Sequence, residues 1–225
     1  HTCGCNKHSR HRSGGQRSEE DKCELQLGSV QAAVATESES LSDAAAALAS
    51  KDAVTVTREI TSSQSITIPS VSSSTGETSK SLSLEKVATG ASLAVTDGNT
   101  TGNEANSVDN FTLSIPNNET QEFDALDVTI DMPNTTVTLA GNGGVATYGN
   151  VTASTADNTL VLSGGVKVNK VIVKKGNIRV NKGAELVAIE KDKENTAEIV
   201  TVYVEEGAKI PTLPDGFKVA SDDEL

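Results

Sequence analysis

The sequence predicts an all-β fold built by stacking short strands, and three observations support that prediction. Four segments resemble one another, each with alternating apolar residues between an Asn and a Gly. From residue 53 onward, β-branched residues alternate with Ser and Thr at a period of two, which is typical of strands. Aromatic residues make up only 2% of the chain, so aliphatic side chains must fill the core. The four segments are Asn134–Gly141, Asn158–Gly164, Asn169–Gly176 and Asn177–Gly183.

Repeated strand-and-turn units indicate an architecture that grows rung by rung. A parallel β-helix, or solenoid, fits best, because identical aliphatic residues can stack along a narrow core. A β-sandwich is the alternative, since it also produces short strands at regular intervals, but it usually carries more aromatic bulk. Spacing between equivalent positions is irregular, roughly 8 to 24 residues, which excludes a strict hexapeptide or nonapeptide repeat.

The chain divides into three predicted parts. Residues 1–28 are polar and hold all the His and Cys residues, which predicts a flexible N-terminal arm. Residues 29–210 form the β domain, which opens with a short helix near residues 42–50. Ser42 and Asp43 are the N-cap candidates of this helix. Residues 211–225 are expected to be an irregular tail that caps the C-terminal end.

The predicted strands follow the helix in order, separated by turn-like runs and by a Gly/Asn-rich loop at Asp97–Asn106. Besides the four Asn-to-Gly segments, strands are expected at Ala53–Ile60, Ser65–Ile68, Ser81–Leu84, Ser92–Val95, Asn110–Ile115, Asp127–Met132, Val145–Ala153 and Glu198–Val204.

The run SDAAAALASKDAVTVTREITSSQSITIPS (42–70) resembles the start of secreted bacterial right-handed parallel β-helix proteins of the pectate-lyase-like superfamily. In those proteins a short helix caps the solenoid before the first rungs. The same sequence pattern continues through residues 80–95 and 169–189. The resemblance therefore implies a single right-handed β-helix over about residues 40–210. Some members act on polyuronates. Others are non-catalytic surface or cell-adhesion proteins of Gram-negative bacteria, often lipid-anchored, and fold likeness does not choose between them.

Composition excludes several function classes. The net charge is −12 and the pI is about 4.7, so the chain lacks the basic surface that nucleic acid or anionic lipid requires. No stretch approaches the ~18 consecutive apolar residues of a transmembrane helix.

The carboxylates of Asp127 and Asp131 are the candidate site. On a strand, these two residues and Thr129 point to one face, and such oxygen ligands suit Ca²⁺. A solvated acidic face is the alternative. The resemblance implies that a polyuronate lyase also needs an Arg or Lys base. No basic residue lies between Lys86 and Lys167. Rungs could still bring a more distant base alongside, and the candidates are Arg58, Lys80 and Arg179.

The arm offers two further hypotheses, against the alternative of a simple tether. Its soft ligands suit zinc, although their spacing is not that of a standard finger. Gly4–Cys5 resembles the end of a lipid-attachment motif. Because every His lies in the arm, histidine catalysis on a rigid scaffold is not expected. The soft ligands are Cys3, Cys5, His8, His11 and Cys23.

We therefore expect a non-enzymatic β-helix scaffold, extracellular or at the cell surface in association with an outer membrane, that binds a glycan or a protein. Apart from Ca²⁺, no cofactor is expected. The alternative is a carbohydrate-active β-helix enzyme, a lyase or a hydrolase. Two or three acids with a Lys or Arg in one groove would favour the enzyme, whereas a groove lined only by Ser, Thr and Asn would favour the scaffold.

Overall fold

In the computed structural model, the described residues are 35–72, 76–118, 121 and 123–221, all within the unit Ala33–Leu225. The arm at residues 1–28 lies outside them, and so do the zinc ligands and the lipid-attachment motif predicted there.

The all-β prediction is confirmed, since strands follow one another along the described part of the chain with one short α-helix and one 3₁₀ turn. The helical elements are α1 (Leu41–Leu48) and η1 (Glu104–Asn106). The strands of the first half are β1 (Thr36–Ser38), β2 (Ala53–Val56), β3 (Ser63–Ile68), β4 (Ser79–Leu84), β5 (Ser92–Asp97), β6 (Asn110–Ile115) and β7 (Leu126–Asp131). Those of the second half are β8 (Thr136–Gly141), β9 (Ala146–Leu162), β10 (Val166–Val180), β11 (Glu185–Leu186), β12 (Ile189–Lys191), β13 (Val200–Val204) and β14 (Phe217–Ser221).

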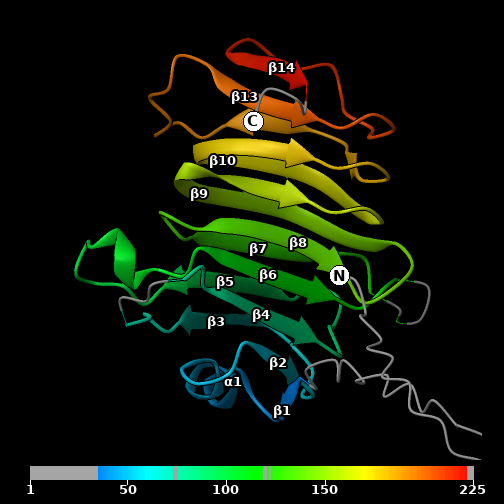
Figure 1. The fold of residues 1–225 in the computed structure, drawn as a ribbon. Helices are drawn as coiled ribbons and strands as arrows, with labels where there is room; N and C mark the ends of the chain where they lie inside the picture. Colours follow the sequence, from blue (N-terminus) through cyan, green and yellow to red (C-terminus); the bar gives the residue numbers. More distant parts are fainter. Residues whose placement is uncertain (1–34, 73–75, 119–120, 122, 222–225) are drawn as a thin grey trace, which may run out of the picture. The chain divides into compact units, whose positions relative to one another are not determined.

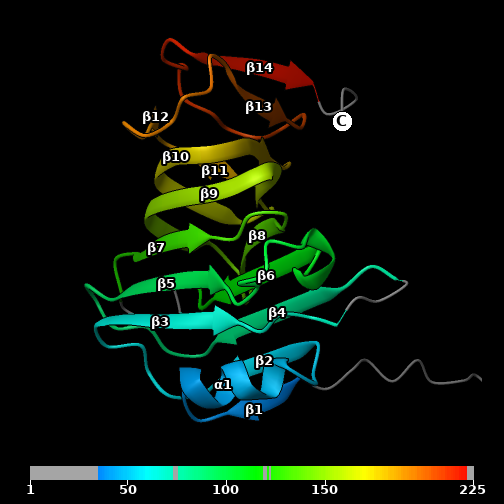
Figure 2. The same cartoon turned by 90° about the vertical axis from the view of Figure 1, so that its left-hand side faces the viewer.

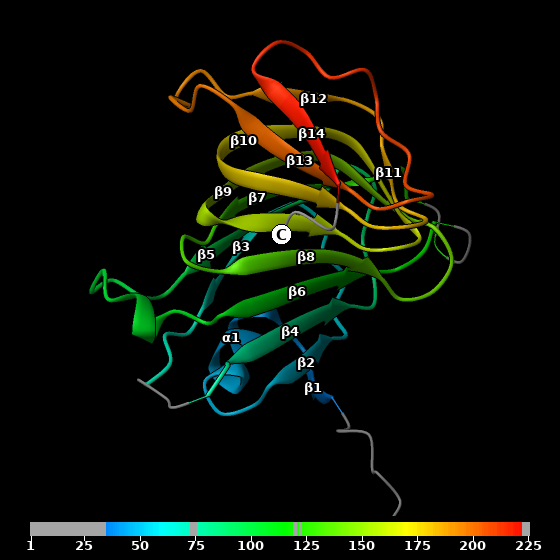
Figure 3. The same cartoon turned by 45° about the horizontal axis from the view of Figure 1, so that its top comes forward.

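The strands pair in parallel to form one large sheet that curls as a half-barrel (Figures 1 and 3). Strands β1, β2, β4, β6 and β8 form a first row, which continues through the C-terminal parts of β9 and β10 to β13 and β14. Strands β3, β5 and β7 form a second row, which continues through the middle of β9 and β10 to β12 (Figure 2). Every pairing among the described strands is parallel, which does not fit the antiparallel sheets of a β-sandwich.

Aliphatic columns form the core, because in-register parallel pairing places like residues above one another. One column of the first row runs through Leu82, Leu113, Leu139 and Leu162, and all four are fully buried. The second row buries a matching column: Leu93, Val128, Val151, Val171 and Ile189. Aliphatic side chains thus fill most of the core, which agrees with the small share of aromatic residues.

The helix predicted near residues 42–50 is α1, but its N-cap is Ser40 rather than Ser42 or Asp43. The Ser40 hydroxyl oxygen accepts a hydrogen bond from the Asp43 backbone N–H at 3.2 Å. The helix begins earlier because Leu41 belongs to its buried face, together with Ala44 and Leu48. That face packs on the core at the end of the sheet formed by β1 and β2 (Figure 1).

Three further predictions of strand bounds are wrong. The segments Val145–Ala153 and Asn158–Gly164, expected as separate strands, share β9. The C-terminal segment expected to be irregular contains β14, which pairs in register with β13. The segments Asn169–Gly176 and Asn177–Gly183, expected as separate strands, share β10. Gly176 does not end the strand, because its positive φ of 89° lets the chain bend there while the ladder to β9 shifts register and resumes.

The buried phenol of Tyr148 ties two parts of the sheet together. Its hydroxyl oxygen lies 2.8 Å from the carbonyl oxygens of both Leu113 and Ala140 and shares its proton with them. Burial raises the pKa of Tyr148 above its ordinary value, and the hydrogen bond to Ala140 lowers it by less. The hydroxyl therefore stays protonated and acts as a donor inside the core.

Replacing Tyr148 with Phe is expected to lower the free energy of unfolding by about 1 to 2 kcal/mol, because two buried carbonyl groups lose their side-chain donor. Urea unfolding measures the change. Tyr203→Phe, at a half-buried position, is the matched control and should change stability by less than about 0.5 kcal/mol. Equal losses in the two variants would contradict this role for Tyr148.

Candidate functional site

Asp127 and Asp131 lie on the exposed face of β7, as the strand period predicts. They differ in what they contact. An Asp127 carboxylate oxygen accepts a hydrogen bond of 2.7 Å from the Asn150 backbone N–H, so it supports the join between β7 and β9. No hydrogen bond or ion pair within the described residues involves the Asp131 side chain. Asp131 is thus the carboxylate available to a ligand.

Residues four apart on a strand have Cα atoms about 13 Å apart, so Asp127 and Asp131 would each have to bind Ca²⁺ separately. Among the described residues, no three His, Cys, Asp or Glu side chains come together as a metal site. Calcium binding at Asp127 and Asp131 stays a prediction.

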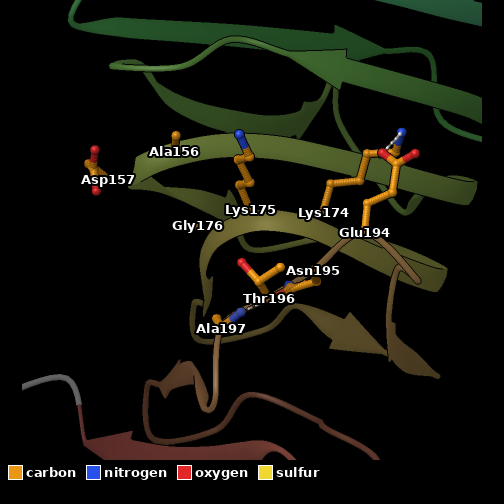
Figure 4. Close-up of a pocket in the computed structure, with 9 residues that line it drawn as sticks. All are labelled: Ala156, Asp157, Lys174, Lys175, Gly176, Glu194, Asn195, Thr196 and Ala197. Carbon is orange, nitrogen blue, oxygen red and sulfur yellow. Dashed lines mark hydrogen bonds and ion pairs between the residues drawn. The ribbon is translucent and has the colours of Figure 1, made fainter.

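A groove of mixed charge lies next to Asp131 where β7, β9 and β10 meet the loop after β12. We call it the mixed-charge groove and define it by Asp131, Ser154, Lys174, Lys175 and Glu194, which line a hollow of about 320 Å³ with Thr129 and Ile130. An adjoining pocket of about 250 Å³ adds Asp157, Asn195 and Thr196 around the same lysines (Figure 4).

Strand register brings the charges of this groove together. Asp131 pairs with Ser154, and Ser154 pairs with Lys175, so a carboxylate, a hydroxyl and an amine follow one another across three strands. The Lys174 ammonium lies 3.5 Å from the Glu194 carboxylate. Both partners are well exposed, so the pair contributes at most about 1 kcal/mol.

Lys175, unlike Lys174, forms no ion pair with Glu194. Figure 4 shows its side chain directed away from Glu194, and its ammonium group has no hydrogen bond or ion pair within the described residues. It can therefore bind an anion.

None of the three bases that the sequence analysis considered lies in the mixed-charge groove. Lys80 is buried, and its ammonium donates to the Lys51 carbonyl oxygen at 2.8 Å and to Asp52 at 3.1 Å. Arg58 lines a pocket beside α1. Arg179 lies on the first row, where it donates to Asn181. The sequence pattern missed Lys174 and Lys175 because only the register shows that they approach Asp131.

A second polar surface lies on the first row, which we call the hydroxyl face. It consists of the outward residues of three adjacent strands, Ser81 and Ser83 of β4, Thr112 and Ser114 of β6, and Thr136 and Thr138 of β8. All are half-exposed. Strands lie about 4.8 Å apart and outward residues about 6.7 Å apart along each strand, so the hydroxyls form a regular grid.

Most of the grid is available to a ligand. Thr136 donates a long hydrogen bond to Asn158, and Ser81 to the Asp52 carbonyl oxygen, each 3.4 Å. The hydroxyls of the other four residues have no hydrogen-bond partner within the described part of the chain. The sequence pattern did not reveal this grid, because its hydroxyls come from three separate strands.

Aromatic side chains contribute little to either surface. Phe111, Phe123 and Tyr148 are buried in the core. Tyr203 is half-buried and lies in the same column as Thr138, three strands further along the first row. The outward residues Val161 and Arg179 lie between Tyr203 and the hydroxyl face in that column.

Comparison with known proteins gives no relative, since no protein family, curated protein or solved structure matches the chain. In the described part of the chain, neither helix has the length and apolar character needed to cross a membrane.

Replacing Asp127 with Ala is expected to lower the free energy of unfolding by about 1 kcal/mol, because the Asn150 N–H loses its acceptor. Asp131→Ala is the matched control on the same strand and face, and it should be neutral within about 0.5 kcal/mol. Thermal unfolding without Ca²⁺ measures both. A larger loss for Asp131→Ala would contradict the assignment of a structural role to Asp127.

Proposed function

We propose that this chain is a non-enzymatic scaffold of the right-handed β-helix type, extracellular or at the cell surface, and that it binds a polysaccharide on its hydroxyl face. The observation that carries the proposal is the grid of six hydroxyls on three adjacent strands. Four of these hydroxyls have no hydrogen-bond partner among the described residues.

The β-helix assignment draws support from the topology. Alternate strands pair in parallel along two rows, and β9 and β10 each pass from one row to the other within a continuous strand. Parallel connections in one sheet are almost always right-handed. The helix α1 covers the N-terminal end of the core, as the resemblance to secreted β-helix proteins implies.

A polysaccharide is the ligand class that suits the hydroxyl face. Ser and Thr hydroxyls both donate and accept hydrogen bonds, as sugar hydroxyls do. The outward positions of β4, β6 and β8 that form the grid carry no charge. Binding a neutral polysaccharide there therefore removes no charged side chain from water. Beyond the grid, the column of Thr138 continues through Val161 and Arg179 to Tyr203, which offers one ring for a sugar to stack on.

Replacing both Thr112 and Thr138 with Val is expected to weaken polysaccharide binding at least about tenfold, because two hydrogen bonds to the ligand are lost at constant side-chain volume. A panel of neutral and acidic polysaccharides, measured by affinity electrophoresis, identifies a ligand and then tests the variant. Thr196→Val, in the pocket beside the mixed-charge groove, is the control and should bind normally. Loss of binding in the control alone would move the site to that groove.

A second candidate function has its own observation. The mixed-charge groove holds two acids with two lysines, the composition expected of a carbohydrate-active β-helix enzyme. In such an enzyme Lys175 would act as the base and Asp131 would hold the substrate, directly or through Ca²⁺. The groove is open and its charged side chains face solvent, whereas an active site is usually a concave pocket that encloses most of its ligand. This favours the scaffold.

The enzyme alternative predicts cleavage of a uronate or neutral polysaccharide in the presence of Ca²⁺, with released oligosaccharides read by mass spectrometry. Lys175→Ala and Asp131→Ala should each reduce the rate at least about a hundredfold, and Lys193→Ala, an exposed lysine nearby, should not. On the scaffold proposal we expect no cleavage by the unmodified protein, and cleavage with this variant pattern would overturn it.

A further inference from the structure

Charges of opposite sign flank β9 on the outward face of the second row. We call the surface made by β5, β7, β9, β10 and β12 the second-row face. Its acids Asp127 and Asp131 lie on β7, and its lysines Lys170, Lys174 and Lys175 lie on β10. Of these lysines, Lys174 pairs with Glu194 of the loop after β12. The β9 residues between them are uncharged, namely Asn150, Thr152 and Ser154.

Each acid lies level with a base two strands away. Ser154 pairs with both Asp131 and Lys175. Asn150 pairs with Lys170, and its backbone N–H donates to Asp127. The backbones of the acid and the base in each set are therefore about 10 Å apart across the sheet, and no ion pair joins them within the described residues.

We propose that two copies of this chain associate face to face through the second-row face, with the two-fold axis parallel to the strands and passing over β9. Rotation about this axis places β7 of one copy over β10 of its partner. Each residue keeps its height along the strand direction. Asp131 then faces the partner's Lys175, and Asp127 faces the partner's Lys170. The interface is isologous, so each contact occurs twice.

The charge pattern selects this axis. A two-fold axis along the stacking direction would instead lay β7 over β7 and set carboxylates against carboxylates. With the axis over β9, the β12 residue Glu190 faces β5 of the partner, whose outward Ser92, Ala94 and Thr96 carry no charge. No like charges on these five strands then meet across the interface.

The state of the side chains is consistent with such a partner. Asp131 and Lys175 have no hydrogen bond or ion pair within the described residues, so their pairing breaks no existing contact. Lys170 lies 3.2 Å from Glu190, and both are exposed enough for Lys170 to bridge Glu190 and the partner's Asp127. The dimer would also cover the mixed-charge groove while leaving the hydroxyl face open.

The size of the face sets the expected strength. Five strands at about 4.8 Å spacing and six residues at about 3.3 Å give roughly 24 by 20 Å, which corresponds to about 1,000 Å² buried in total. This is the lower limit for a specific interface. We therefore expect a dimer that dissociates in the micromolar range and weakens with salt.

Sedimentation equilibrium of the full chain, at low salt and over a micromolar concentration series, tests the proposal. Asp131→Lys and Lys175→Asp should each raise the dimer dissociation constant roughly a hundredfold, since each reversal sets like charges together at two symmetric places. The double variant Asp131→Lys, Lys175→Asp restores opposite signs and should dimerise to within about tenfold of the unmodified chain.

Glu37→Lys and Lys218→Asp are the matched controls, with the same charge changes on β1 and β14, and they should leave the dissociation constant unchanged. Circular dichroism verifies that every variant is folded. A monomeric unmodified chain would overturn the proposal, and so would a dimer that neither reversal weakens. Failure of the double variant to recover would also overturn it, because the two side chains would then not face each other.

Discussion

In-register parallel pairing is the constraint on which the rest of this structure depends. Since side chains alternate between the two faces of a strand, each register position becomes a column that is either wholly inside or wholly outside. Leu82, Leu113, Leu139 and Leu162 stack inside, and the same register sets Thr112 beside Thr138 outside. A slip of one residue would expose the leucines and bury the hydroxyls, so the core fixes the pattern of the surface.

The same register makes the two ends of the first row different. The core-facing column that includes Phe111 and Val202 begins at Lys80, whose aliphatic stem continues the stack and whose ammonium is satisfied by Lys51 and Asp52. At the other end, Val219 continues the column but is 56% exposed, whereas its neighbour Val202 is fully buried. A buried cation thus closes one end of the column without breaking its packing, while the other end shows an apolar residue to solvent.

Much of the fold could be predicted from the sequence, because local patterns decide it. The alternation in Asn110–Ile115 gave a strand with those bounds, and the Ala-rich run gave α1. The errors arose where tertiary contacts override local signals. Gly176 looked like a strand end, yet β10 continues through it because β9 supplies a ladder on both sides. The candidate site was harder to predict from the sequence, because Asp131 and Lys175 are 44 positions apart. Only the strand register brings the two residues to one groove.

Charge is ordered along the stacking direction, and this order gives the two rows different chemistry. The segment between Lys86 and Lys167 contains no base, whereas β10 carries five bases and no acid. On the second row, β9 lies between β7 and β10, so opposite charges lie at the same level on either side of it. On the first row, β4, β6 and β8 direct hydroxyls outward. The second-row face is thus suited to a charged, complementary surface and the hydroxyl face to a neutral ligand, and a single chain could engage both at once.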